Sequence, residues 1–73
     1  MNISQAFGLA LREKRKSRNL SQEGFPLISN RTYISSLERG MKSPTLEKIE
    51  EICSTLDTHP LGLLKLEYEK LET

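Results

Sequence analysis

The stretch NRTYISSLERG, residues 30–40, combines polar side chains suited to binding with the spacing of a short helix. Ile34 and Leu37 lie three residues apart, which predicts an apolar stripe along one side. The other side carries one guanidinium and several hydroxyl groups, those of Arg31, Thr32, Ser35 and Ser36. Such groups match the donors and acceptors that base edges present in the major groove of DNA. Binding of double-stranded DNA by this helix is our working hypothesis.

Residues at both ends of this stretch favour a helix of this length. Asn30 is a good N-cap, because its side-chain oxygen can accept a hydrogen bond from a backbone N–H of the first turn. Gly40 suits the position just past the last turn. The polar side chains would therefore be carried on a helix rather than on a loop.

The rest of the chain offers no pattern for catalysis. It has one histidine, His59, before a helix-starting proline, and one cysteine, Cys53, on an apolar stripe. Neither belongs to a recognisable nucleophile–base arrangement. A single cysteine excludes a disulfide within the chain and a thiolate metal cluster, and no glycine-rich phosphate loop follows a strand. We therefore expect no enzyme activity, no metal and no cofactor.

Charge is divided unevenly along the chain, although the net charge is only +1. Residues 1–42 contain eight basic and three acidic residues, a net charge of +5, whereas residues 43–73 carry −4. A basic half and an acidic half favour one anionic partner and a surface directed away from it. The alternative is that these charges only solvate the surface of a small helical protein.

Length and composition favour a single domain. At 73 residues the chain is near the lower size for a domain with its own hydrophobic core. Its N-terminus lacks the pattern of a signal peptide, and no apolar run approaches the ~20 residues of a membrane-spanning helix. The single cysteine is typical of a reducing compartment. We predict a cytoplasmic protein that does not bind membranes.

The hydrophobic spacing predicts an all-α fold of five helices. The first helix would begin at Ser4, as its N-cap, and end near Arg18. The second would begin at Ser21 and anchor Phe25 in the core, but Gly24 and the following proline limit it to about two turns.

The third helix is the one within residues 30–40, and the last two follow it. Thr45 is the expected cap of a fourth helix, whose buried stripe would begin with Leu46 and continue to Leu56. A fifth helix would run from Pro60 to Glu72, with His59 as a possible cap.

Four motifs resemble the helix-turn-helix domain of phage Cro and repressor proteins, the XRE-like regulators. They are LSQE at 20–23, RTYISSLERG at 31–40, SPTL at 43–46 and the segment 56–64, in matching order and spacing. RTYIS is also similar to the controller proteins of restriction–modification systems. The resemblance implies one lambda-repressor-like DNA-binding domain over residues 1–73, with its helix-turn-helix in helices 2 and 3. The interval from Gln22 to helix 3 is about two residues shorter than the family usually has.

The resemblance also implies roles for individual residues. The family inserts the third helix into the major groove with its N-terminus first. Base contacts would then come from the start of this helix, namely Arg31, Thr32 and Ser36, flanked by Tyr33 and Ser35. Backbone phosphates would be bound by the surrounding residues Gln22, Asn30, Arg39, Lys42 and Arg18. An ion pair between Arg15 and Glu38 would join the first helix to the third.

Several of these residues have a second interpretation. Arg31 could be solvated at the first turn without touching a base. Tyr33 could pack on the end of the second helix instead of contacting DNA. The basic run from Lys14 to Arg18 could be an ordinary exposed turn. In each case both interpretations are open.

The last helix has more apolar residues than one face of a small domain needs. Helix-turn-helix domains usually bind paired half-sites as two-fold dimers. We therefore predict a homodimer on a near-palindromic operator, with residues 60–73 as the dimerisation helix and an interface of Leu63, Leu66, Tyr68 and Leu71. The alternative is that this helix only covers the monomer core. A different function would be an antitoxin or interaction module that holds a partner protein encoded nearby.

Overall fold

The computed structural model describes residues 1–25 and 31–72, and this part of the chain folds into helices without any strand. The predicted all-α class is therefore confirmed. The helices in the described residues are α1 (Ile3–Ser17), α2 (Arg31–Glu38), α3 (Leu46–Leu56) and α4 (Pro60–Glu72).

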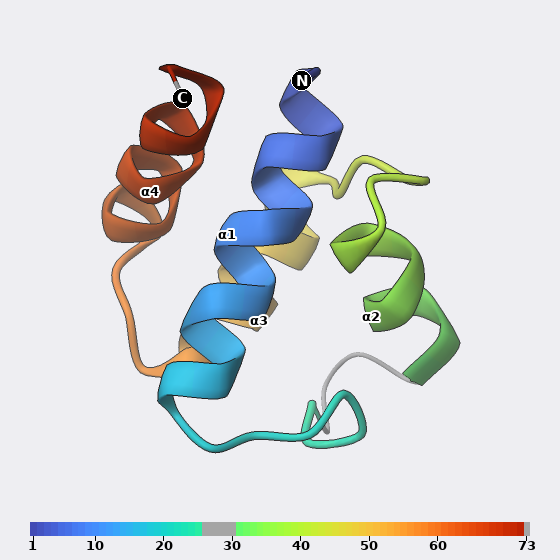
Figure 1. The fold of residues 1–73 in the computed structure, drawn as a ribbon. Helices are drawn as coiled ribbons and strands as arrows, with labels where there is room; N and C mark the ends of the chain where they lie inside the picture. Colours follow the sequence, from blue (N-terminus) through green and yellow to red (C-terminus); the bar gives the residue numbers. More distant parts are fainter. Residues whose placement is uncertain (26–30, 73) are drawn as a thin grey trace.

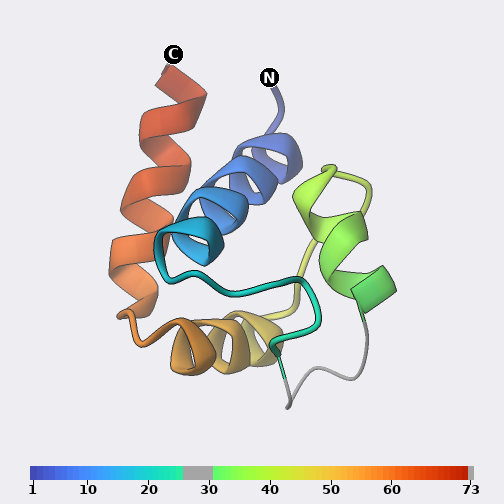
Figure 2. The same ribbon diagram turned by 60° about the horizontal axis from the view of Figure 1, so that its bottom comes forward.

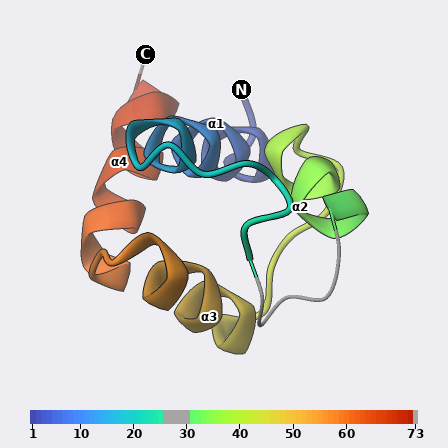
Figure 3. The same cartoon turned by 90° about the horizontal axis from the view of Figure 1, so that it is seen from below.

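The four helices are arranged around one interior (Figure 3). α1 lies between α4 on one side and α2 on the other (Figure 1). α4 runs antiparallel to α1, so both chain termini lie at the same end of the molecule. α3 closes the remaining side, behind α1 in Figure 1 and below it in Figure 2.

The prediction of five helices is wrong for the described residues. Where the second helix was expected to begin, residues 21–25 form a turn, in which the N–H of Gly24 donates to the carbonyl of Ser21 at 3.0 Å. A segment with a glycine and a proline in its first six residues has little intrinsic stability as a helix. Phe25 is nevertheless a core residue at 3% exposure, as predicted. The predicted cap Asn30 lies outside the described residues.

α1 begins earlier than predicted. Its N-cap is Asn2, whose side chain accepts the N–H of Gln5 at 2.8 Å while the Gln5 side chain accepts the N–H of Asn2 at 3.0 Å. This reciprocal capping box satisfies two N–H groups that the helix leaves unpaired. The predicted cap, Ser4, is inside the helix, and its hydroxyl is bonded to that of Ser43 at 2.8 Å.

α2 ends in a tight turn at Gly40, as the sequence predicted. The N–H of Met41 donates to the carbonyl of Ser36 at 2.9 Å, and that of Gly40 donates to Leu37 at 3.0 Å. This is a Schellman motif, and it requires the left-handed backbone that Gly40 adopts with φ of 72°. A Cβ at this position would lie 2.9 Å from the Cα of Gln5, so the turn also packs against the start of α1.

α3 has the predicted cap at its start, and a side chain from a distant part of the sequence caps its end. The hydroxyl of Thr45 accepts the N–H of Lys48 at 3.1 Å. At the other end, the Arg18 guanidinium donates to the carbonyls of Leu56 at 3.0 Å and Asp57 at 3.3 Å. Arg18 therefore stabilises the C-terminal end of α3, where a cation is favoured.

α4 begins at Pro60 as predicted, with the Nδ1 atom of His59 accepting the N–H of Leu61 at 3.1 Å. The predicted burial of Leu46 at the start of α3 is wrong, because this side chain is 85% exposed. Its position in the first turn of α3 carries it past the edge of the core.

The core is apolar and draws on every helix. Gly8 of α1 lies against the end of α2, where an added Cβ would be 2.4 Å from the carbonyl oxygen of Leu37. This close approach lets side chains of the two helices interlock. The buried cluster consists of Phe7, Ala10, Leu11, Phe25, Ile34, Leu37, Ile52, Cys53, Leu56 and Leu63.

Candidate nucleic-acid interface

The rotation of α2 is fixed by its two core residues. Ile34 and Leu37 are both fully buried, at 0% exposure, so the opposite side of the helix faces solvent. Arg31 and Thr32 are exposed in the first turn. The structure therefore presents the guanidinium and one hydroxyl at the N-terminal end of α2, which is the end expected to meet a groove.

The two serines of α2 are placed less favourably for reading bases. Ser36 is only 8% exposed, so little of its side chain is available for the predicted base contact. The apolar stripe does not explain this burial, because at 3.6 residues per turn position 36 lies on the side of α2 away from Ile34 and Leu37. Ser35 is half-buried. The exposed surface at the start of α2 thus has fewer polar side chains than the sequence predicted.

A buried polar network joins α2 to α1 and to the turn after α1. The Arg15 guanidinium donates to both carboxylate oxygens of Glu38, at 2.6 and 3.0 Å, and to the carbonyl of Leu20 at 2.8 Å. Gln22 donates to the same carboxylate at 3.2 Å. The hydrogen bond to Glu38 is the main cause of the raised pKa of Arg15. The network fixes α2 relative to α1 and the turn.

The predicted phosphate-binding residues divide into two groups. Arg39 and Lys42 are exposed just beyond the C-terminal end of α2. Lys42 also lies over the ring of Tyr33, 5.7 Å from its centroid, a cation–π distance that holds it beside the helix. Tyr33 is half-buried and packs against the core.

The other predicted phosphate ligands have structural partners or fall outside the described residues. Arg18 donates to the C-terminal end of α3, so it has a structural role beside the phosphate contact that the sequence predicted. Gln22 is half-buried and donates to Glu38. Asn30 lies outside the described residues.

Sequence reasoning missed one acidic residue at this surface. Glu23, in the turn after α1, places a carboxylate oxygen 3.8 Å from a guanidinium nitrogen of Arg31. Both side chains are exposed, at 71% and 68%. The available signal was that only seven residues separate the two positions in the sequence.

α4 has both buried and exposed apolar residues. Leu63 is fully buried at 0% exposure, so its predicted place in a dimer interface is wrong and it belongs to the monomer core. Leu66 packs partly against that core, and Leu71 is half-buried. Tyr68 is 54% exposed, and Leu61, which was not predicted, is 68% exposed.

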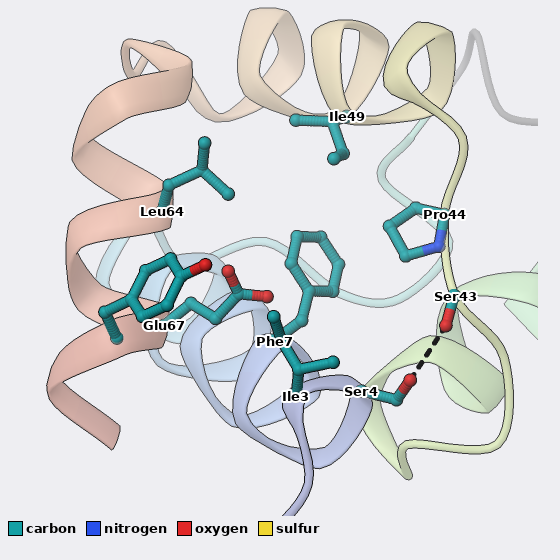
Figure 4. Close-up of a pocket in the computed structure, with 9 residues that line it drawn as sticks. Ile3, Ser4, Phe7, Ser43, Pro44, Ile49, Leu64 and Glu67 are labelled. Atoms are coloured by element: carbon teal, nitrogen blue, oxygen red, sulfur yellow. Dashed lines mark hydrogen bonds between the residues drawn. The ribbon is translucent and has the colours of Figure 1, made fainter. Parts of the chain in front are cut away.

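A cavity of about 250 Å³ lies between α1, α3, α4 and the segment that precedes α3 (Figure 4). Its walls are mainly apolar, and Ser4 and Ser43 at its edge are bonded to each other. Glu67 is 5% exposed and points toward this space, and its burial raises the pKa of the carboxyl group. Glu67 makes no hydrogen bond or ion pair with another described residue, and its carboxylate oxygens are not completely closed off from solvent.

Other kinds of site were sought in the described part of the chain. Residues 1–25 and 31–72 contain no cluster of three or more metal-binding side chains. None of the described helices is long and apolar enough to cross a membrane.

Comparisons with known proteins agree with this geometry. A family model described as helix-turn-helix matches residues 11–63. The control protein C.BamHI of Bacillus amyloliquefaciens is 42% identical over 66 residues, which cover 86% of this chain and 82% of the relative.

Two solved structures have the same fold. The restriction-modification controller protein C.AhdI from Aeromonas hydrophila has a TM-score of 0.76 and 35% identity, covering 82% of this chain and 90% of that one. The clp gene regulator ClgR from C. glutamicum has a TM-score of 0.86 and 25% identity, covering 94% and 92%. The chain therefore belongs to the XRE-type helix-turn-helix family, whose members are regulators and controllers of transcription rather than enzymes.

Proposed function

We propose that this protein is a sequence-specific regulator that binds an operator in double-stranded DNA through the N-terminal end of α2. The observation that carries the proposal is the exposure of Arg31 and Thr32 on a helix whose orientation is fixed by the buried Arg15–Glu38 pair. A guanidinium held in this way can pair with the O6 and N7 atoms of guanine, a contact that contributes about 1–3 kcal/mol of discrimination. Thr32 can contact a thymine methyl group or donate a hydrogen bond.

Affinity would come mainly from phosphate contacts at the other end of α2. Arg39 and Lys42 are exposed there, after the turn at Gly40. Their charges would set the salt dependence of binding, because each neutralised phosphate releases counterions. Ser35 and Tyr33, both half-buried, would lie at the edge of the contact.

The names of the relatives suggest which genes are regulated. C.AhdI is a restriction-modification controller, and C.BamHI is a control protein. By this similarity, the protein acts in the cytoplasm as a controller or repressor of restriction–modification genes. A restriction endonuclease and a methyltransferase encoded beside its gene would support this role, and a toxin gene in that place would favour an antitoxin instead.

The regulator would act as a homodimer whose contact includes α4. Leu61 and Tyr68 are seven residues apart, which places them on one side of the helix, and both are more than half exposed. Leu71 borders this stripe, whereas Leu66 lies about 140° around the helix from Leu61 and packs against the core. Such a surface can pair with its own copy about a two-fold axis, which would match a near-palindromic operator.

Selection of bound sequences from a random DNA pool tests the proposed function. We expect recovery of a near-palindrome with half-sites about one helical turn apart. Recovery of unrelated sequences would reject specific recognition, and a single half-site would reject the dimer. Sedimentation at micromolar concentration gives the oligomeric state independently.

Two variants separate base reading from phosphate binding. Arg31→Ala should lower the preference for the selected operator over unrelated DNA by about tenfold or more, with little change in salt dependence. Lys42→Ala should weaken binding to all sequences alike and reduce the slope of log K against log salt by about one. If both variants bound like the wild type, the assigned surface would be wrong.

A further inference from the structure

Glu23 is an acidic side chain on the surface that the proposed function assigns to DNA. Its carboxylate Oε1 lies 3.8 Å from Nη1 of Arg31, and each side chain is about two-thirds exposed or more. Glu23 follows Gln22 directly, and Gln22 is fixed by its hydrogen bond to Glu38. The backbone that carries Glu23 is therefore tied to the same network that orients α2.

An unpaired carboxylate at this position would oppose DNA binding, because every phosphate near it carries a like charge. The contact with Arg31 reduces this repulsion, because the guanidinium carries the opposite charge. Arg31 has five N–H donors, and the carboxylate engages one end of the guanidinium. The remaining donors are available to the edge of a base.

We propose that Glu23 is a specificity-determining residue that positions Arg31 for a guanine edge and disfavours its pairing with phosphate. The inference rests on the proposed reading of bases by Arg31. In an unspecific complex, a phosphate that approached Arg31 would also meet the Glu23 carboxylate. In the specific complex, the uncharged O6 and N7 acceptors of guanine meet the guanidinium without that repulsion. Glu23 thus weakens binding to the wrong partner, which increases selectivity.

Loss of fold does not complicate the test of this role. An exposed ion pair at 3.8 Å contributes little to stability. Variants of Glu23 are therefore expected to keep the melting temperature of the wild type, and circular dichroism checks this. A change in DNA binding can then be assigned to the surface.

Two substitutions separate the effect of the Glu23 charge from the effect of Glu23 on the position of Arg31. Glu23→Gln removes the negative charge but keeps an oxygen that can accept from Arg31, whereas Glu23→Ala removes both. Glu72→Gln, an exposed acid near the end of α4, is the control for the change in net charge. The affinity of each variant is measured for the selected operator and for an unrelated duplex of equal length, at several salt concentrations.

We expect Glu23→Gln to bind the unrelated duplex about three- to tenfold more tightly, with a salt slope steeper by up to about one. Its affinity for the operator should change less, so the specificity ratio should fall. Glu23→Ala should in addition bind the operator more weakly. Glu72→Gln should alter both affinities equally. In an Arg31→Ala background, Glu23→Gln should leave the specificity ratio unchanged.

The outcomes distinguish this inference from the function on which it rests. If Arg31→Ala lowers the specificity ratio but neither Glu23 variant does, the role of Glu23 is overturned and base reading by Arg31 stands. An equal effect of Glu23→Gln with and without Arg31 also overturns the inference. If Arg31→Ala leaves the ratio unchanged, base reading by Arg31 itself is rejected.

Discussion

Two buried carboxylates, Glu38 and Glu67, lie on opposite sides of α1 and differ in their partners. Glu38, at 9% exposure, accepts hydrogen bonds from Arg15 and Gln22. Glu67, at 5% exposure, faces a mainly apolar cavity and has no hydrogen bond or ion pair within the described residues. The α1–α2 junction is thus fixed by directional polar contacts. The α1–α4 junction depends on apolar packing, and the burial of the Glu67 charge there is unfavourable.

This difference matches what each junction must do under the proposed function. A reading helix requires an orientation held to a fraction of an ångström, which a bidentate ion pair supplies better than apolar contacts do. A helix that pairs with a second copy needs an apolar surface and can tolerate a small change of tilt. The substitutions below test the contrast, from the largest expected effect to the smallest.

Replacement of Glu38 by Ala should have the largest effect on stability. It leaves the buried Arg15 guanidinium without its counterion, and removal of one partner of a buried pair costs about 3–5 kcal/mol. Denaturant unfolding monitored by circular dichroism measures the loss. Exposed Glu72→Ala is the control and should change stability by less than about 0.5 kcal/mol. A loss below about 1 kcal/mol for Glu38→Ala would contradict the importance of the network.

Gly8→Ala tests the close approach of α1 and α2. Its Cβ would lie 2.4 and 2.6 Å from the carbonyl oxygens of Leu37 and Glu38, so the helices would have to separate, at a cost of about 1–3 kcal/mol. Gly62→Ala in α4 is the matched control, because its nearest neighbour would be the Thr58 hydroxyl oxygen at 3.4 Å. We expect this control to stabilise the protein by about 0.5–1 kcal/mol through helix propensity. A Gly8→Ala variant as stable in thermal unfolding as Gly62→Ala would contradict the close approach of α1 and α2.

Glu67→Gln should stabilise the protein at neutral pH by about 1 kcal/mol, because it removes a desolvated charge. Burial raises the pKa of Glu67 in the folded state above its ordinary value of 4.5. As the pH falls through this raised pKa, the folded wild type takes up a proton and loses the cost of the charge. The advantage of the variant should therefore be largest above the raised pKa and disappear near pH 4.5.

Melting temperatures of wild type and Glu67→Gln across pH 4–8 measure this difference. A constant difference over the whole range, or a variant that is less stable at neutral pH, would mean that the carboxylate is well solvated or paired.

Lys70→Ala should have the smallest effect. Its amino group lies 3.2 Å from a Glu13 carboxylate oxygen across α1 and α4, but both side chains are accessible to water. Exposed pairs of this kind contribute about 0–1 kcal/mol and are weakened by salt. We expect a change in melting temperature of at most a few degrees, which 0.5 M salt should abolish. A salt-independent loss would indicate that Lys70 acts through packing.

Sequence patterns were sufficient for much of the fold. Apolar spacing and caps predicted α2, α3 and α4, with Thr45 and Gly40 at the expected ends. These signals are local, because a cap or a turn acts within a few residues. The start of α1 was misplaced because Asn2 and Ser4 are both good caps, and the choice depends on the reciprocal bond with Gln5.

The errors in the candidate site come from contacts between distant residues. The structural role of Arg18 was not predicted, because its partner at the end of α3 is 38 residues away in the sequence. Leu63 was assigned to an exposed face of the last helix, but it is buried in the contact of α4 with its neighbours. Ser36 is buried although it lies away from the Ile34–Leu37 stripe. Periodicity determines which residues share a face, whereas burial depends on the neighbouring helices, which a single sequence does not specify.

The single cysteine, Cys53, is 1% exposed and belongs to the core, and burial raises the pKa of its thiol. A thiol in this state reacts with alkylating reagents only after the structure around it opens. Cys53 is thus a native probe of local opening. The labelling rate at Cys53 reports how often α3 detaches from its neighbours, with and without DNA, and no introduced probe is required.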